Sequence, residues 1–84
     1  MAIITLLTDY GTRDGYVAAL KGVIAGIAPE ARVDDITHEI PPYDIAHAAF
    51  VLGQVWRWFP VGTIHVLVAM VSPTSSNHFV QSIV

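Results

Sequence analysis

Cysteine is absent from this 84-residue chain, and basic residues are scarce. Without cysteine the chain has neither a disulfide framework nor thiolate chemistry. It has four Lys and Arg residues against seven Asp and Glu, a formal net charge of −3 at pH 7, and no run of basic residues. Nucleic-acid binding depends on clustered positive charge, so we expect no nucleic-acid partner.

The sequence also lacks a long uninterrupted apolar run. The longest, from Trp58 to Val71, is broken by Pro60, Gly62 and His65, whereas a membrane-spanning helix needs about 20 apolar residues. The first residues have neither the positive charge nor the apolar length of a signal peptide. We therefore expect no membrane association and a cytoplasmic location.

Apolar residues are plentiful for a chain of this size. Hydrophobic residues make up 54% of the sequence and charged residues 13%, which excludes the polar, highly charged composition of a disordered segment. A short chain exposes proportionally more surface than a long one. The apolar excess therefore predicts surface that is covered by further chain or by a partner.

Three short apolar runs predict β-strands. Ile3 to Thr8 and Thr63 to Ala69 are rich in apolar and β-branched residues, as in strands buried on both faces. Arg32 to Thr37 forms a second run between them, and Phe79 to Val84 has the composition to begin a fourth strand. Polar or proline-containing loops separate all four runs.

Two stretches between the strands have helical periodicity. The first, Tyr16 to Ala28, is ended by Pro29, and the second follows Asp44, a residue type favoured at helix N-caps. The order β-α-β-α-β predicts an α/β fold, a parallel sheet with flanking helices. The stripe expected to be buried on the first helix is Val17, Leu20, Ile24 and Ile27, with Lys21 outside it. A second helical stripe comprises Ile45, Ala48, Ala49, Leu52, Trp56 and Phe59.

Ligands of open parallel sheets bind beyond the carboxyl ends of the strands, so the loops there are the candidate sites. The loop from Asp9 to Tyr16 places two carboxylates and two glycines between a strand and a helix. A carboxylate at a strand end can accept hydrogen bonds from both hydroxyls of a ribose. The alternative is that Asp9 and Asp14 cap only the turn and the start of the helix.

The second loop carries His38, Glu39 and Tyr43. Pro41 and Pro42 interrupt the stretch in which a His-Glu-x-x-His zinc motif would need its second histidine. We therefore expect no metal and interpret His38 as a polar loop residue. Tyr43 could face a ligand, although from its chemistry alone ordinary packing is favoured.

The remaining histidines and the tryptophans give no separate site. His47 and His65 have no partner at metal-ligand spacing and are interpreted as structural. Trp56, Trp58 and Phe59 cluster at the end of the second helix with one basic neighbour. They are more typical of a core or an interface than of a base-stacking surface.

Five motifs in register resemble the start of the S-adenosylmethionine hydroxide adenosyltransferase family, whose relatives include the SAM-dependent chlorinase and fluorinase. The resemblance covers residues 2 to about 68. The motifs are Thr8-Asp9-Tyr10-Gly11-Thr12-Arg13-Asp14-Gly15-Tyr16, Lys21-Gly22-Val23-Ile24, Asp35-Ile36-Thr37-His38-Glu39-Ile40-Pro41-Pro42-Tyr43-Asp44-Ile45, Ala48-Ala49-Phe50-Val51-Leu52 and Phe59-Pro60-Val61-Gly62-Thr63-Ile64-His65.

The resemblance implies an enzyme that cleaves S-adenosylmethionine by attack of hydroxide or halide at the ribose 5′ carbon, with neither metal nor cofactor. It implies a homotrimer with each site between the N-terminal domain of one subunit and the C-terminal domain of the next. Asp9 would hold the ribose hydroxyls, with Tyr10 beside it. Asp14 would contact the methionine amine, Tyr16 the methionine carboxylate, and Tyr43 the nucleophile pocket.

The chain departs from the family after the third strand. Hydroxide-using members carry Asp-Pro-Gly-Val-Gly-Thr there, followed by basic residues, and their Asp, Arg and a later His are the groups that activate water. This chain has Met70-Val71-Ser72-Pro73-Thr74-Ser75-Ser76-Asn77-His78. We therefore interpret residues 1–69 as an incomplete N-terminal S-adenosylmethionine-binding domain and residues 70–84 as a divergent tail. No catalytic residue is assigned.

Two alternatives stay open. A flavodoxin-like binding module, such as a phosphoacceptor receiver, would need an aspartate at the end of the third strand, where Ala69 and Met70 stand. A truncated, non-catalytic chain would fold only with partner chain, which agrees with the high apolar content and with an open sheet edge.

Overall fold

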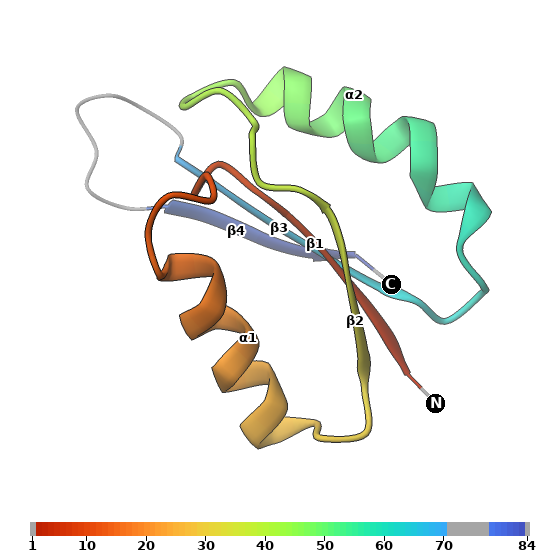
Figure 1. Cartoon of the computed structure of the whole chain (residues 1–84). Helices are drawn as coiled ribbons and strands as arrows, with labels where there is room; N and C mark the ends of the chain where they lie inside the picture. Colours follow the sequence, from red (N-terminus) through yellow and green to blue (C-terminus); the bar gives the residue numbers. More distant parts are fainter. Residues whose placement is uncertain (1, 71–77, 84) are drawn as a thin grey trace.

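The computed structural model describes residues 2–70 and 78–83, with side chains described for 2–70. Figure 1 shows two helices and four strands along the chain. The elements are β1 (Ile3–Thr8), α1 (Tyr16–Ile27), β2 (Arg32–Thr37), α2 (Ile45–Val55), the 3-10 turn η1 (Trp56–Trp58), β3 (Ile64–Met70) and β4 (His78–Ile83). Strands β1 and β2 have the predicted bounds, and β3 begins and ends one residue later than predicted.

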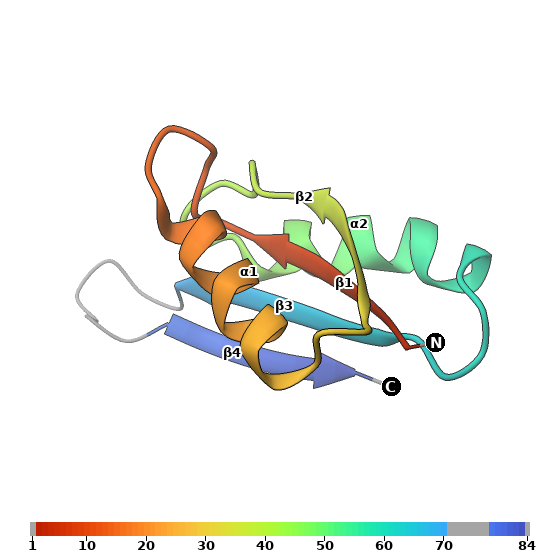
Figure 2. The same cartoon turned by 60° about the horizontal axis from the view of Figure 1, so that its bottom comes forward.

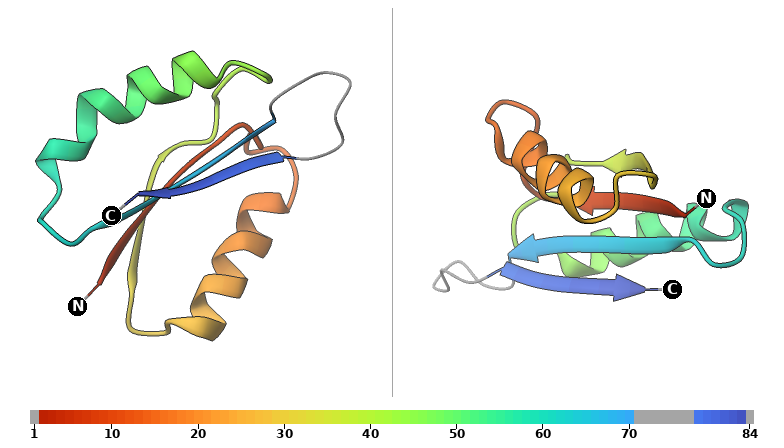
Figure 3. Two further views of the ribbon diagram at one scale, coloured as in Figure 1. Left: turned by 180° about the vertical axis from the view of Figure 1, so that it is seen from behind. Right: turned by 90° about the horizontal axis from the view of Figure 1, so that it is seen from below.

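The four strands form one sheet in the order β2-β1-β3-β4. Strand β1 runs parallel to both neighbours, with Ile4 opposite Val33 of β2 and opposite Ile64 of β3. Strand β4 pairs antiparallel with β3, as the right-hand view of Figure 3 shows. The predicted three-stranded parallel sheet is confirmed, and the fourth strand, whose direction the sequence left open, adds an antiparallel edge.

The helices cover opposite faces of the sheet. Figure 2 shows α1 in front of the strands and α2 behind them. This arrangement follows from the strand order, because the chain moves from β1 to β2 on one side and then crosses back over β1 to reach β3. In doubly wound sheets, a crevice opens at the carboxyl ends of the two central strands, at the point where the strand order reverses. Here those strands are β1 and β3.

The apolar core lies on the α2 face. Ala48 of α2 is fully buried, and Leu52 is 8% exposed. Burying a large apolar side chain such as that of Leu52 stabilises the folded state by roughly 1.5–3 kcal/mol. The core cluster comprises Leu7, Ile40, Ala48, Leu67 and Ala69, with Ile36, Ile45 and Val51 packed against it.

The α1 face is covered more loosely. Alternation along β1 places Leu6 on this face, opposite to Leu7, and Leu6 is fully buried. Helix α1 itself has no buried residue: Val17, Leu20 and Ile24 are half-buried, and Ile27 is 80% exposed. The expected burial of Ile27 is therefore wrong. Ile27 ends the helix at the turn into β2, so its side chain passes beyond the strands that α1 covers.

The helices are short. Helix α1 has 12 residues and α2 has 11. Within residues 2–70 and 78–83, no helix has the length and apolar character that crossing a membrane requires.

Candidate functional site at the carboxyl edge of the sheet

Asp9 lies at the crevice between β1 and β3. It follows the last residue of β1, and its backbone N–H donates to the carbonyl of Val68 in β3 at 3.2 Å. Its carboxylate Oδ2 accepts the N–H of Met70, the last residue of β3, at 2.7 Å. Asp9 thus connects the carboxyl ends of both central strands, and its carboxylate has a fixed position at the predicted ligand edge.

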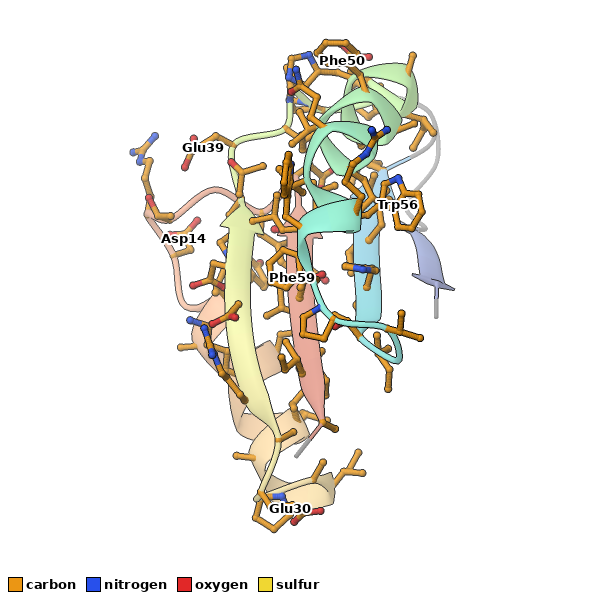
Figure 4. The ribbon with its side chains drawn as sticks, turned by 90° about the vertical axis from the view of Figure 1, so that its right-hand side faces the viewer. Asp14, Glu30, Glu39, Phe50, Trp56 and Phe59 are labelled. Atoms are coloured by element: carbon orange, nitrogen blue, oxygen red, sulfur yellow. The ribbon has the colours of Figure 1, made fainter. Side chains whose placement is uncertain are left out.

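The loop after Asp9 is fastened to the loop after β2. Gly11 has φ +70°, a left-handed conformation that costs glycine little, and its N–H donates to the carbonyl of His38 at 2.7 Å. The Thr12 hydroxyl donates to Glu39 Oε1 at 3.4 Å. Parallel pairing of β1 and β2 places both loops at one edge. In Figure 4, Asp14 and Glu39 lie toward the end to which the β2 arrow points, and Glu30 lies at the other.

Two tyrosine rings stack beside this loop. The Tyr10 and Tyr16 ring centroids are 5.6 Å apart, with an interplanar angle of 28°. Tyr16 begins α1 and is 62% exposed, so the stack presents an aromatic surface with polar tips at the carboxyl edge. Offset pairs of this kind contribute about 0.5–1.5 kcal/mol beyond their buried area.

Asp14 does not cap α1. The N-cap residue is Gly15, and no side chain accepts a capping hydrogen bond there. Asp14 is exposed. The alternative interpretation is that Asp9 and Asp14 cap only the turn and the start of the helix. For Asp14, this interpretation is therefore wrong. Asp9 does stabilise the strand ends, through Met70.

Tyr43 has a strained backbone. Its φ is +67°, the left-handed region that bulky residues rarely occupy. The N–H of Asp44 donates to the carbonyl of Pro41 at 3.2 Å, so Pro42 and Tyr43 are the central residues of a turn whose third position usually takes glycine. Such strain costs about 1–3 kcal/mol and is concentrated at functional sites. The Tyr43 side chain is 43% exposed at the same edge as Asp9.

Asp44 begins α2 as predicted. Its Oδ1 accepts the N–H of His47 at 2.9 Å, the bond of an N-cap side chain to the third helical residue. This cap fixes where the turn that contains Tyr43 ends and the helix begins.

His38 lies in the loop after β2, as the sequence predicted, and its side chain is buried. It is 6% exposed, because its ring lies between the end of β1 and the residues of β2. Its Nδ1 is 2.7 Å from Thr8 Oγ1, and its Nε2 is 2.8 Å from Asp35 Oδ1. The Asp35 carboxylate also accepts a hydrogen bond from Lys21 Nζ of α1 at 2.8 Å.

This network affects the Asp35 carboxyl. Partial burial raises its pKa, while the hydrogen bonds from Lys21 and His38 and the charges of both groups lower it. The lowering effects together exceed the burial effect, so the pKa of Asp35 lies below its ordinary value of 3.8. Asp35 is thus a carboxylate near neutral pH and acts as a hydrogen-bond acceptor.

His65 lies away from the edge, on the α2 face. Its Nδ1 is 2.6 Å from Thr5 Oγ1, and its ring meets Phe59 edge-on with centroids 5.6 Å apart. Burial lowers the pKa of His65 below its ordinary value of 6.5. Such an environment suits the structural interpretation of this residue.

An apolar groove of about 860 Å³ runs between α2 and β3. None of the residues that line it carries a carboxylate, so it lacks the acceptor proposed for a ribose and a counter-charge for an amine. Trp56 contributes to it and is 53% exposed; Figure 4 shows Trp56, the first residue of η1, apart from Asp14. The lining residues are Ile45, Ala49, Leu52, Gly53, Trp56, Arg57, Phe59, Pro60, Val61, Gly62, Thr63, His65 and Leu67.

Metal-ligating residues do not gather at the edge. In the described part of the chain, no three His, Cys, Asp or Glu side chains lie close enough together to hold an ion. Proposals for this site therefore depend on carboxylates, tyrosines and backbone groups.

The predicted contact residues lie on two neighbouring loops. Asp9, Tyr10, Asp14 and Tyr16 come from the β1–α1 segment and Tyr43 from the β2–α2 segment, both at the carboxyl edge. The sequence analysis missed the hydrogen-bonded group formed by the buried Thr8 and His38 with the partly exposed Asp35. One signal was present, since a strand with adjacent aspartates in an otherwise apolar sheet requires partners for them.

Comparison with known proteins agrees with this picture. Residues 4–82 match the family described as SAM hydroxide adenosyltransferase N-terminal domain. The (R)-S-adenosyl-L-methionine hydrolases of Salinispora arenicola and Methanocaldococcus jannaschii are 49% identical over 65 residues and 46% identical over 76 residues. The alignments cover 77% and 86% of this chain but 24% and 28% of those proteins.

A solved structure supports the fold. The structure described as an uncharacterized conserved protein from Thermotoga maritima superposes with a TM-score of 0.71 at 37% identity. It covers 84% of this chain, and the chain covers 26% of it. The chain thus spans about a quarter of the length of the relatives that it matches.

Proposed function

The chain belongs to the SAM hydroxide adenosyltransferase N-terminal domain family, and from that premise we propose that its carboxyl edge binds S-adenosylmethionine for attack at the ribose 5′ carbon. The observation that carries the proposal is the position of Asp9, whose carboxylate lies where β1 and β3 end. Hydroxide is favoured over halide as the nucleophile, because both relatives compared above are named hydrolases.

Asp9 would hold the ribose. A carboxylate can accept several hydrogen bonds at once, so Asp9 can keep the Met70 N–H and accept the 2′ and 3′ hydroxyls together. Holding both hydroxyls orients the 5′ carbon in line with the nucleophile and the sulfur. Orientation of this kind can contribute about 7–11 kcal/mol to a displacement.

The leaving group needs little help from the protein. The bond from the nucleophile oxygen to the 5′ carbon forms as the carbon–sulfur bond breaks, and its electron pair neutralises the sulfonium to give methionine. With water as nucleophile, one proton goes to solvent. The protein therefore has to align and desolvate the reacting atoms more than to protonate a leaving group.

The remaining contacts follow from the two loops. Asp14, exposed beside the Tyr10–Tyr16 stack, would meet the methionine amine, and Tyr16 the methionine carboxylate. The strained turn would place the Tyr43 ring against the nucleophile pocket. These aromatic rings would exclude water from the reacting carbon.

The proposal includes the setting in which the site works. It needs neither metal nor cofactor, since the substrate carries its own charged leaving group. We place it in a cytoplasmic homotrimer in which a second subunit contributes the other wall of the site. Sedimentation or light scattering of the protein would measure the assembly, and a monomer at all concentrations would contradict this part.

Binding of adenosine to the 84-residue chain tests the ribose contact. In an NMR titration, we expect the largest amide shifts in the Asp9–Tyr16 loop and near Tyr43. The matched ligand 2′,3′-dideoxyadenosine should bind at least about 10-fold more weakly, because it cannot donate to a charged acceptor. Equal affinity for both ligands, or shifts confined to the groove at Trp56, would contradict the proposed site.

Turnover by this chain alone is not expected. The groups that activate water in hydroxide-using relatives have no counterpart after β3, where Met70 to His78 stand. A site with one wall also loses much of the orientation effect. Chromatography should show no adenosine or methionine above a no-enzyme control. Turnover that disappears in Asp9→Ala would show that the divergent segment supplies the missing groups.

A further inference from the structure

A chain of hydrogen bonds leads from α1 to the loop that carries Asp9. The Asp35 carboxylate can only accept, so His38 must donate from Nε2 at 2.8 Å. When the ring is neutral, Nδ1 is the acceptor of the hydrogen bond from the Thr8 hydroxyl at 2.7 Å. The Thr8 oxygen in turn accepts the backbone N–H of Tyr10 at 3.2 Å. With a neutral ring, every hydrogen bond of this sequence has one defined direction.

We propose that Thr8, His38 and Asp35 are positioning residues that set the conformation of the Asp9–Tyr10 segment and thereby the affinity of the carboxyl edge for a ribose. The inference rests on the proposed function for its ligand. Its structural part, the ordering of Tyr10 by a buried side-chain network, can be measured without any ligand.

A direct chemical role for this network is excluded by burial. An Asp-His-Thr sequence resembles the charge network of a nucleophilic hydrolase. Thr8 is 0% exposed and His38 is 6% exposed. A nucleophile or a base has to reach the substrate within hydrogen-bond distance, and these atoms face one another inside the protein. Their effect can reach a ligand only through the backbone of the loop.

His38 holds the loop at a second point, which strengthens the positioning argument. Its backbone carbonyl accepts the N–H of Gly11 at 2.7 Å. Two successive amides, those of Tyr10 and Gly11, are therefore fixed by Thr8 and His38. Asp9 immediately precedes these amides, so the direction of its carboxylate depends on the same contacts.

The far end of the network reaches α1. Lys21 Nζ donates to Asp35 Oδ2 at 2.8 Å, with both side chains about 40% exposed. An exposed pair of this kind contributes little to stability. It does orient Asp35, so that the other carboxylate oxygen faces His38.

The chain contains a matched control for these contacts. Thr5 and His65 form a second buried hydroxyl–imidazole pair at 2.6 Å, with Thr5 0% exposed and His65 6% exposed. This pair lies on the α2 face, where His65 lines the groove beside α2. Thr5→Val and Thr8→Val each delete a buried hydroxyl that is paired with an imidazole. Only Thr8→Val removes a member of the network that reaches Tyr10.

The first test compares Thr8→Val, Thr8→Ser and Thr5→Val in the 84-residue chain. Hydrogen exchange followed by NMR should show the Tyr10 amide exchanging roughly 3–10-fold faster in Thr8→Val, from the loss of one hydrogen bond. Thr8→Ser should restore slow exchange. Adenosine affinity should fall by a similar factor in Thr8→Val and stay unchanged in Thr5→Val. Equal losses in both valine variants would overturn the inference in favour of general destabilisation.

The second test uses Asp35→Asn, a partly exposed position at which the fold should survive. In imidazole-¹⁵N-labelled protein, His38 should have its proton on Nε2 and a non-protonated Nδ1. Asp35→Asn should reduce this preference and speed Tyr10 exchange several-fold, while His65 stays unchanged. A wild-type His38 with the proton on Nδ1 would overturn the assigned directions.

The two proposals fail in different ways. If wild-type chain does not bind adenosine while the exchange and tautomer results hold, the proposed function is contradicted and the ordering network is supported. If adenosine binds but Thr8→Val changes neither Tyr10 exchange nor affinity, the positioning inference is wrong and the site remains.

Discussion

The two faces of the sheet differ in what holds them together. On the α2 face, apolar side chains of the helix are buried against Leu7 and Leu67. On the α1 face, Leu6 of the sheet is fully buried but the helix fully buries none of its own residues, and a polar network runs from Lys21 through Asp35 to His38. The comparison indicates that one face supplies most of the folding free energy. The other face orders the edge at which a ligand would bind.

Large-to-small substitutions should show the greatest contrast between the faces. Leu67→Ala removes a core side chain that is 5% exposed, and we expect it to lower the free energy of unfolding by about 2–5 kcal/mol. Ile27→Ala on α1, at 80% exposure, should change it by less than about 0.5 kcal/mol. Urea unfolding followed by circular dichroism measures both. Similar losses would mean that α1 packs as tightly as α2.

The helix N-caps should give the next largest contrast. Asp44→Ala removes the bond to the His47 amide and should cost about 1 kcal/mol, within the usual range of 0.5–2. Helix α1 begins at Gly15, with no side-chain cap. Gly15→Ala removes no side-chain hydrogen bond and should therefore cost less than Asp44→Ala. A larger loss in the Gly15 variant would show that α1 depends on its first turn more than α2 does.

A pH effect on the α2 face should be the smallest of the three. Burial lowers the pKa of His65 in the folded state, so below about pH 6.5 the unfolded chain binds the proton more readily. The contribution of neutral His65 to stability is thus fully present above that pH, and it is lost as the pH drops toward the folded-state pKa of His65. Asp35, whose pKa is also lowered, loses its contribution only at pH values below 3.8.

Thermal unfolding at pH 7 and pH 5 measures this effect. His65→Gln should reduce the difference in Tm between the two pH values. The matched variant His47→Gln, at an exposed position of α2, should leave the difference as it is. The same difference in His65→Gln as in wild type would assign the effect to another group.

The regular elements could be predicted from the sequence. β1 has the expected bounds because it is a short apolar run that ends at turn residues, and β2 because Val33 and Ile36 lie in a short segment between turns. Ile27 could not be placed correctly, since periodicity shows which face of a helix is apolar but not how far the sheet beneath it extends. The burial of His38 could not be predicted for a related reason: it depends on Thr8 and Asp35, which lie on two different strands.

The candidate site could be predicted only in part. The predicted end of the first strand placed Asp9 at the ligand edge. The hydrogen bond from the Met70 N–H to the Asp9 carboxylate, which joins the two central strands, could not be predicted from the sequence. The strain at Tyr43 has no sequence signal either, because only the backbone shows a bulky residue at a glycine position of a turn. The ligand roles of Asp9, Tyr10, Asp14, Tyr16 and Tyr43 stay predictions.

The titration of S-adenosylmethionine into Asp9 variants tests the central claim most directly. In NMR-monitored titrations, Asp9→Ala should lose about 2–4 kcal/mol of binding free energy, which is the effect of removing a charged acceptor from two hydroxyls. Asp9→Asn, which can still accept the Met70 N–H, should lose an intermediate amount. Asp34→Ala, which removes the carboxylate paired with Arg32 on β2, serves as the control and should bind as wild type does. An affinity unchanged in both Asp9 variants would contradict the account.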